Sequence, residues 1–143
     1  MSTNDFDLRQ FLPYVLNRAA EVTSIGFQKH YREKYGMLRT EWRVLFHLGR
    51  YGEMTAKEIC ARAGLHKTKV SRAVGALEQK RFLKRSTQEQ DRRLETLSLS
   101  PQGQTVYADL SAAARTYDDA LAAQFTQEER DVLDRCLARL AGG

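Results

Sequence analysis

The sequence is poor in cysteine and proline, with two of each in 143 residues, and it has no apolar run as long as a membrane span. Residues 1–7 are polar and acidic, so the basic start and apolar stretch of a secretory signal peptide are missing. It has no glycine-rich phosphate loop, and no nucleophile, base and orienting group suggest themselves as a catalytic set. These absences predict a cytoplasmic protein that is not an enzyme and uses no cofactor.

The few cysteines and histidines give no metal-ligand spacing either. Cys60 and Cys136 lie far apart, and with the three histidines they form none of the short spacings typical of zinc sites, so we expect no metal. Each cysteine lies among apolar residues of a predicted helix, which favours a small buried side chain. A redox-active thiol is the alternative.

What the chain does have is positive charge concentrated in one segment. Between Lys57 and Arg93 there are 11 lysines and arginines against four acidic residues, a net charge of +7, whereas the rest of the chain, with 12 against 14, carries −2. The net charge of +5 therefore arises locally, which is typical of a phosphate-binding surface. A charged face that only contacts solvent is the plainer alternative.

Before this segment, apolar residues at helical spacing predict a long helix over about 11–35. Pro13 belongs to its first turn, residues 7–10 form a separate turn before it, and Gly36 ends it. Thr40 is then expected to cap a second helix.

After the segment, Ser100 and Pro101 open a helix that reaches about residue 124, and Thr126 with Glu129 forms a capping box for the last helix. These helices, like the first, carry long apolar stripes that a small module cannot cover. Such stripes usually pair with a second copy of the same chain, so we expect a homodimer.

The charged segment itself predicts a helix-turn-helix. Thr55 and Glu58 form a capping box for a short helix ending near Ala63, and a further helix covers 67–80 after the turn at Gly64. Apolar residues occupy the inward positions of that further helix, namely Val70, Val74 and Leu77. Its opposite face is small, polar and basic, as a helix that reads the major groove requires.

Two short strands, 82–86 and 94–99, with a polar link at 87–93, complete the predicted module as a hairpin or wing. The expected fold is mainly α with a small β-hairpin (α+β), a winged helix-turn-helix flanked by N- and C-terminal dimerisation helices. Residues 1–36 and 101–143 form the predicted dimerisation region, and 37–100 the predicted DNA-binding region, within one intertwined unit. Two recognition helices of a dimer would then meet successive major grooves, about one DNA turn apart.

The element order and three sequence runs resemble the MarR family of winged-helix regulators. The runs are Gly64–Arg72 (GLHKTKVSR), Leu77–Glu78, and the wing residues Asp91–Arg93 followed by Leu97–Gly103 (LSLSPQG). The resemblance implies a homodimeric transcription factor, usually a repressor, that binds a pseudopalindromic operator. It also implies release from DNA by a small, often phenolic, ligand or by an oxidant.

The expected DNA-binding residues lie on the 67–80 helix and the wing: Lys67, Thr68, Lys69, Ser71, Arg72, Gln79, Arg85, Asp91, Arg92 and Arg93. The resemblance places an Asp-x-Arg pair of the wing on Asp91 and Arg93, where a carboxylate restrains one guanidinium while another enters the minor groove. Lys67 and Arg85 suit phosphates better than bases. For Arg72 and Arg93 the plainer alternative is an exposed surface arginine.

Aromatic and cationic residues of the first two helices form a candidate effector site: Tyr14, Arg18, His30, Trp42, Arg43, Phe46 and His47. A cation among rings suits a small aromatic carboxylate, because the cation binds the acid while the rings bury the remainder. Ordinary core packing explains the same residues without a ligand.

Three positions depart from the family pattern. His66 stands at a helix start where serine is usual, and Arg81 stands where a helix-ending glycine is usual, so a left-handed conformation there costs on the order of 1 kcal/mol. Gly75 lies inside the 67–80 helix at a cost of about 1 kcal/mol relative to alanine, and close approach of the backbone to DNA is one possible reason.

Two other functions stay open from the sequence. One is a repressor that senses thiol oxidation through Cys60 or Cys136. The other is a winged-helix module that binds a protein and not DNA.

Overall fold

The computed structural model describes residues 5–88 and 90–142, with the side chains of Gln88 and Arg92 left out of that description. The described chain forms a short 3-10 helix, six α-helices and one antiparallel hairpin, which confirms the predicted fold class. In chain order the elements are η1 (Leu8–Gln10), α1 (Leu12–Tyr35), α2 (Arg39–Tyr51), α3 (Ala56–Ala63), α4 (Lys67–Gln79), β1 (Leu83–Gln88), β2 (Asp91–Leu99), α5 (Pro101–Ala122) and α6 (Gln127–Leu140).

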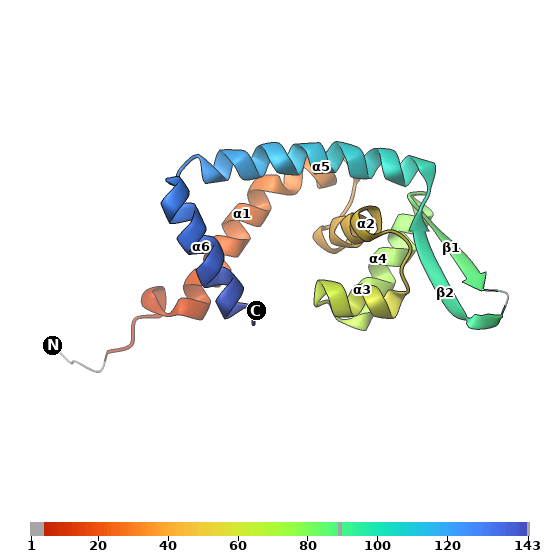
Figure 1. Cartoon of the computed structure of the whole chain (residues 1–143), viewed down its shortest axis with the longest axis horizontal. Helices are drawn as coiled ribbons and strands as arrows, with labels where there is room; N and C mark the ends of the chain where they lie inside the picture. Colours follow the sequence, from red (N-terminus) through yellow and green to blue (C-terminus); the bar gives the residue numbers. More distant parts are fainter. Residues whose placement is uncertain (1–4, 89, 143) are drawn as a thin grey trace.

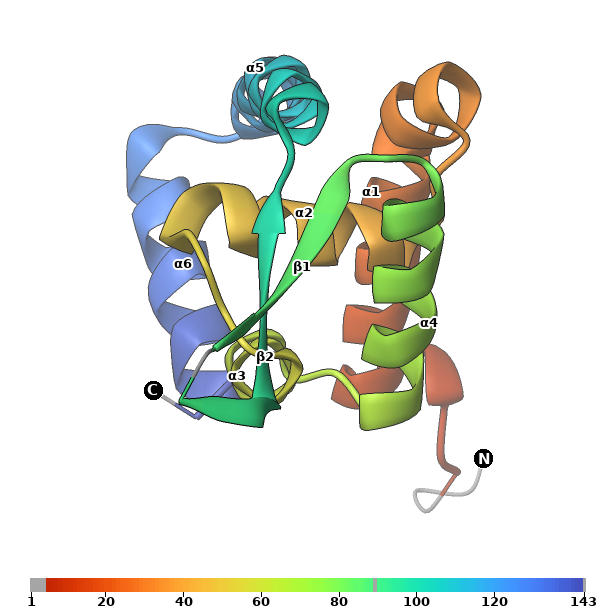
Figure 2. The same ribbon diagram turned by 90° about the vertical axis from the view of Figure 1, so that its right-hand side faces the viewer.

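The long helix α5 spans the molecule and connects its two ends (Figure 1). α6 turns away from one end of α5, and α1 passes beneath the middle of α5 and extends toward the same side, while α2, α3, α4 and the hairpin gather beneath the other end. Turning the molecule shows the hairpin in front of α2 and α3 with α4 beside it (Figure 2). The predicted DNA-binding elements are therefore neighbours in space.

The apolar core lies mainly at this second end. The inward residues predicted for α4, Val70, Val74 and Leu77, are all nearly inaccessible to solvent, as are Ile59 of α3 and Leu97 of β2. Burial of such side chains stabilises the fold by roughly 1.5–3 kcal/mol each. The core therefore fixes α4 by one face and leaves the opposite face free.

Local capping fixes most helix ends as the sequence predicts. Thr55 and Thr126 each accept a hydrogen bond from a backbone N–H three residues later in a complete capping box, and Ser100 accepts one from Gly103 N–H. The prediction that Thr40 caps α2 is wrong. The helix begins at Arg39, with no side-chain cap, because the chain turns directly from α1 into α2 and places Thr40 inside the first turn.

The hairpin is longer than predicted. Its strands pair from Leu83 with Leu99 to Gln88 with Asp91, so Asp91 and Arg93 belong to β2 and not to a link between strands. In a two-stranded ribbon the backbone hydrogen bonds extend through polar residues that face solvent, and these residues give no alternating apolar pattern. Phe82, predicted to begin the first strand, precedes β1 and is buried.

The turn between α4 and β1 is held against the start of α5. Arg81 has the left-handed φ of 68° that was expected to be costly there, and its carbonyl accepts a hydrogen bond of 2.6 Å from Ser100 Oγ. A Cβ on Gly103 would lie 2.0 Å from the carbonyl oxygen of Phe82. Glycine is required at 103 because no side chain fits between the two backbones.

Candidate nucleic-acid interface and effector hollow

The helix-turn-helix is built by α3, a left-handed turn at Gly64 and α4. Gly64 has φ +66°, a conformation that costs glycine little, and its N–H caps α3 at the Cys60 carbonyl. His66 then caps α4, because its Nδ1 accepts a hydrogen bond of 3.3 Å from Thr68 N–H. A histidine therefore occupies the position of the usual serine and still satisfies a free N–H.

The outer face of α4 carries the side chains predicted to contact DNA. Those on α4 are all exposed: Lys67, Thr68, Lys69, Ser71, Arg72 and Gln79. Gly75 belongs to this helix, and a Cβ built on it meets no atom of the described chain within 4 Å. No contact within the described residues therefore requires glycine at this position.

The wing presents Asp91 and Arg93, both exposed, on the first residues of β2. Asp91 Oδ1 accepts a hydrogen bond of 3.0 Å from the backbone N–H of Arg93. The Asp91 carboxylate therefore stabilises the backbone of the wing. The sequence had suggested that it would instead hold an arginine guanidinium in place. The side chain of Arg92 lies outside the described part of the structure.

Arg85 differs from the other predicted DNA-binding residues because two carboxylates already engage it. Its guanidinium lies 2.7 Å from Glu95 Oε1 of β2 and 3.0 Å from Glu78 Oε1 of α4. The hydrogen bond to Glu95, followed by the contacts with Glu78, outweighs partial burial and raises the pKa of Arg85 above its ordinary value. Arg85 therefore joins the wing to α4.

Beside Arg85, a hollow of about 490 Å³ opens between α3, α4 and the hairpin. Lys57, Lys67 and Ser71 line it together with Cys60, which packs half-buried against the core. Cys136 is exposed on α6, so the interpretation of a buried side chain is wrong for this cysteine in the single chain. The described residues contain no group of three or more histidine, cysteine, aspartate or glutamate side chains placed to hold a metal ion.

A second hollow, of about 290 Å³, lies between α1, α2 and α5, and we call it the effector hollow. It is lined by Thr23, Ser24, Phe27, Tyr31, Arg39, Trp42, Arg43, Tyr117 and Leu121. Trp42 stacks on Tyr31 at a centroid distance of 6.1 Å and also contacts Phe27. Four of the nine lining residues are thus aromatic, and two are arginines.

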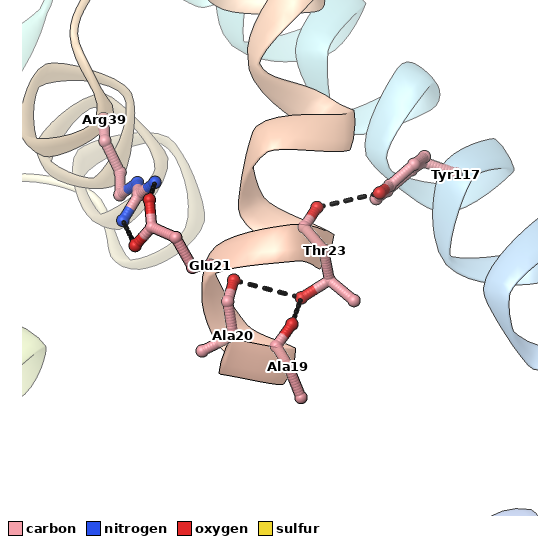
Figure 3. A network of polar contacts seen from close by, with 6 residues as sticks. All are labelled: Ala19, Ala20, Glu21, Thr23, Arg39 and Tyr117. Carbon is pink, nitrogen blue, oxygen red and sulfur yellow. Dashed lines mark hydrogen bonds and ion pairs between the residues drawn. The ribbon is translucent and has the colours of Figure 1, made fainter. Parts of the chain in front are cut away.

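Polar contacts flank α1 on two sides of this hollow (Figure 3). Tyr117 of α5 donates a hydrogen bond of 2.8 Å to the Thr23 carbonyl, and Arg39 of α2 makes an ion pair of 2.9 Å with Glu21. The guanidinium holds the pKa of Glu21 below its ordinary value, chiefly through that hydrogen bond. Gly26 makes room for Tyr117, whose hydroxyl would lie 2.1 Å from a Cβ there.

The structure brings only part of the predicted effector site together. Trp42 and Arg43 line the effector hollow, whereas His30 lines a neighbouring hollow of about 460 Å³ between α1 and α5. Phe46 does not line the effector hollow but packs against Trp42 at a centroid distance of 5.6 Å and against Tyr107. His47 lies beside Tyr51, and Tyr14 and Arg18 lie nearer the start of α1. Arg39 and Tyr117 were missed, and for Tyr117 no local pattern indicated which helix it would contact.

Large apolar side chains are exposed on α1 and α6. Leu133, Leu137 and Leu140 of α6 are between 39% and 55% exposed, and Val22 and Ile25 of α1 are more than half exposed. In the part of the chain that the structure describes, no helix is long and apolar enough to cross a membrane.

The joined α3, turn, α4 and hairpin define a winged helix-turn-helix protein. A family model described as MarR family matches residues 35–94, which contain α2, α3, α4 and β1. The Bacillus subtilis (strain 168) protein YwaE, an uncharacterized HTH-type transcriptional regulator, is 24% identical over 126 residues, covering 88% of this chain and 74% of the relative.

Solved structures of transcriptional regulators have a fold similar to that of this chain. A MarR/EmrR family transcriptional regulator from Acinetobacter sp. ADP1 has a TM-score of 0.84 and 26% identity, over 95% of this chain and 96% of that one. Bordetella bronchiseptica BpsR, whose DNA binding is regulated by 6-hydroxynicotinic acid, has a TM-score of 0.87 and 16% identity, over 98% and 99%. The chain is therefore similar to MarR-family winged-helix transcriptional regulators, and these comparisons support the resemblance that its sequence predicted.

Proposed function

We propose that the protein is a homodimeric repressor that binds a pseudopalindromic operator and is released by a small aromatic carboxylate or phenol. The observation that carries the DNA-binding part is the outer face of α4, whose basic and polar side chains are exposed while its opposite face is anchored in the core. Basic side chains on a rigid helix can contact phosphates and base edges together.

Within this proposal α4 enters the major groove and the wing reaches the neighbouring minor groove. Arg72 is the proposed base reader, because arginine can make two hydrogen bonds to guanine, and Lys67 and Lys69 are proposed phosphate contacts. Arg93 of the wing suits a narrow minor groove of negative potential. For Arg85 the two ion pairs favour a supporting position between α4 and the wing.

Residues 1–36 and 101–143 are the proposed dimerisation region. The exposed apolar side chains of α1 and α6 support it, because a stable monomer rarely exposes so many along two helices: Leu12, Val15, Val22, Ile25, Val132, Leu133, Leu137 and Leu140. Two copies would hold their α4 helices about 34–36 Å apart, as successive major grooves require. Residues 37–100 form the proposed DNA-binding region.

The effector hollow supports control by a small ligand. Aromatic walls bury a ring, and Arg39 and Arg43 offer charge to an acidic group. The regulator BpsR responds to 6-hydroxynicotinic acid, which is an aromatic carboxylic acid with a ring hydroxyl, so the same ligand class is proposed for this chain. The relatives are named as regulators, and we propose no catalytic activity and a cytoplasmic place of action beside DNA.

The test is selection of a binding site from a randomised duplex pool, followed by titration of affinity against salt. We expect log affinity to fall linearly with log salt concentration, with a slope of roughly −0.9 per phosphate contacted. Arg72→Ala and Arg93→Ala should each cost about 1–3 kcal/mol of binding free energy, and Arg115→Ala on α5 serves as the exposed control. Binding unchanged in both variants would leave a protein-interaction module as the better proposal.

A thiol-sensing repressor is the second candidate, favoured by the exposure of Cys136 and the position of Cys60 beside α4. Peroxide treatment of the protein and of a variant with both cysteines replaced by serine separates the two. Loss of DNA binding after peroxide only in the cysteine-containing protein would support this candidate.

A further inference from the structure

One ion pair connects the two proposed regions of the chain. Among the ion pairs formed by the described residues, that between Glu21 of α1 and Arg39 of α2 is the one that joins residues 1–36 or 101–143 to residues 37–100. The others stay within a region: Lys34 with Asp109, Lys80 with Glu41, Arg85 with Glu78 and Glu95, Arg130 with Asp118 and Asp134, and Arg9 with Asp7.

This ion pair lies at the effector hollow. Arg39 lines the hollow with Trp42 and Arg43, and its guanidinium faces Glu21 across the gap between α1 and α2 (Figure 3). The side chain of Arg39 is 35% exposed and that of Glu21 is 51% exposed. Glu21 can therefore leave Arg39 and be solvated by water at little cost.

We propose that Glu21 is a built-in competitor for Arg39, and that the carboxylate of an aromatic acid bound in the hollow replaces it. Glu21 occupies both terminal nitrogens of the Arg39 guanidinium, at 2.9 and 3.5 Å, so an incoming carboxylate that forms its own fork on the same two nitrogens excludes Glu21. The ring of the ligand packs against Phe27 and Trp42, and Arg43 gives it a second cation. This inference rests on the ligand-controlled function proposed above and names the residues that carry the control.

The exchange gives the ligand a means to act on DNA binding. With Glu21 in place, α1 is tied to the first turn of α2 and so to the region that holds α4. With Glu21 displaced, that tie is lost and the two regions can change their relative orientation. A ligand that binds better to the untied state shifts the dimer toward it by its difference in affinity.

The chain carries its own reporter for the test, because Trp42 is its single tryptophan and lines the hollow. Titration of the full-length protein with benzoate and with uncharged benzamide, read by tryptophan fluorescence, should show benzoate binding at least about tenfold more tightly. Glu21→Gln should tighten benzoate binding about 3–10-fold and leave benzamide within twofold. Arg39→Gln should reduce the preference for benzoate to about threefold or less, with Arg43 as the remaining cation. The matched control is Glu33→Gln, the same change on an exposed face of α1.

Affinity for the selected duplex in the absence of ligand gives an independent test, because the inference and the simple effect of charge predict changes in opposite directions. Removal of one negative charge by itself favours binding to DNA, as expected for Glu33→Gln. Glu21→Gln should instead weaken DNA binding about 3–10-fold, because it removes the tie between the regions.

Either of two results overturns the inference: benzoate affinity that Glu21→Gln leaves unchanged or lowers, or DNA affinity of that variant equal to or above that of the control. If the unmodified protein binds the selected duplex in a salt-dependent manner, such a result refutes the exchange alone. If it binds no duplex, the proposed function fails first.

Discussion

Replacement of Gly75 by alanine separates what α4 needs for folding from what it needs for DNA. Gly75 lies inside α4, and the Cβ that alanine adds meets no atom of the described chain within 4 Å. The residues that the structure describes therefore give no steric reason for glycine at position 75. Because glycine is about 0.5–1 kcal/mol less favourable than alanine inside a helix, Gly75→Ala should raise the free energy of unfolding by about that amount.

For a chain of this length such a gain corresponds to an increase in Tm of roughly 1–4 °C, measurable by circular dichroism. The matched contrast is Gly103→Ala, also inside a helix. There the new Cβ would lie 2.0 Å from the Phe82 carbonyl oxygen, so a destabilisation of about 1–3 kcal/mol or more is expected.

Binding to the selected duplex then tests the reason for glycine at position 75. If α4 lies close to DNA along this face, the added methyl group should make the free energy of DNA binding less favourable by about 1 kcal/mol or more, even though the free protein becomes more stable. Fluorescence anisotropy with labelled duplex measures this difference. Increased stability with unchanged affinity would refute close approach at Gly75, and decreased stability would refute the open space around it.

Three further predictions concern other parts of the chain. Arg85→Gln and Glu95→Gln should both weaken DNA binding about threefold or more if their ion pair positions the wing; stronger binding by Glu95→Gln would indicate instead that Arg85 contacts phosphate. Leu137→Asp should convert a dimer to a monomer in light scattering, because it puts a charge on the apolar face of α6, and a persistent dimer would exclude that face as the interface. The hydrogen bond from Lys34 holds the pKa of Asp109 below its ordinary value of 3.8. The stability that this interaction contributes is present above pH 3.8 and should be lost as the pH falls through the lowered pKa. In urea unfolding measured at several pH values, Asp109→Asn should make the free energy of unfolding depend less on pH in this acidic range.

The sequence predicted those parts of the fold that local chemistry decides. Apolar periodicity placed the first helix at about 11–35 against the observed Leu12–Tyr35, and both capping boxes occur where Thr55 and Thr126 predicted them. The prediction that Thr40 caps α2 was wrong because a threonine near a helix start can form a cap but does not have to. The short connection from α1 determines instead that α2 begins at Arg39. A residue that can cap a helix therefore does not by itself decide where the helix begins, and α2 begins without any side-chain cap.

The candidate DNA-binding face was predictable because it is carried by one helix. Residues on α4 share a face through the helical period alone, so the exposure of Lys69 and Arg72 followed from the burial of Val70 and Val74. The effector hollow joins three helices that are separated in sequence. Tyr117 reaches Thr23 across 94 positions, and no periodicity encodes which helices pack together.

The same difference between local and long-range contacts bears on how the molecule could be controlled. Apolar packing of α2 on α5 holds the two regions together, but such packing has little directional preference. Polar contacts fix how the two regions are oriented relative to each other. The Glu21–Arg39 ion pair is such a contact, and because it is exposed to solvent a competing carboxylate can reach it. Tyr117 differs, since its hydroxyl donates to a backbone carbonyl inside the same proposed dimerisation region. A Tyr117→Phe change should therefore alter the hollow without breaking the tie between regions, and its DNA affinity without ligand should stay within about twofold of the unmodified protein, unlike that of Glu21→Gln.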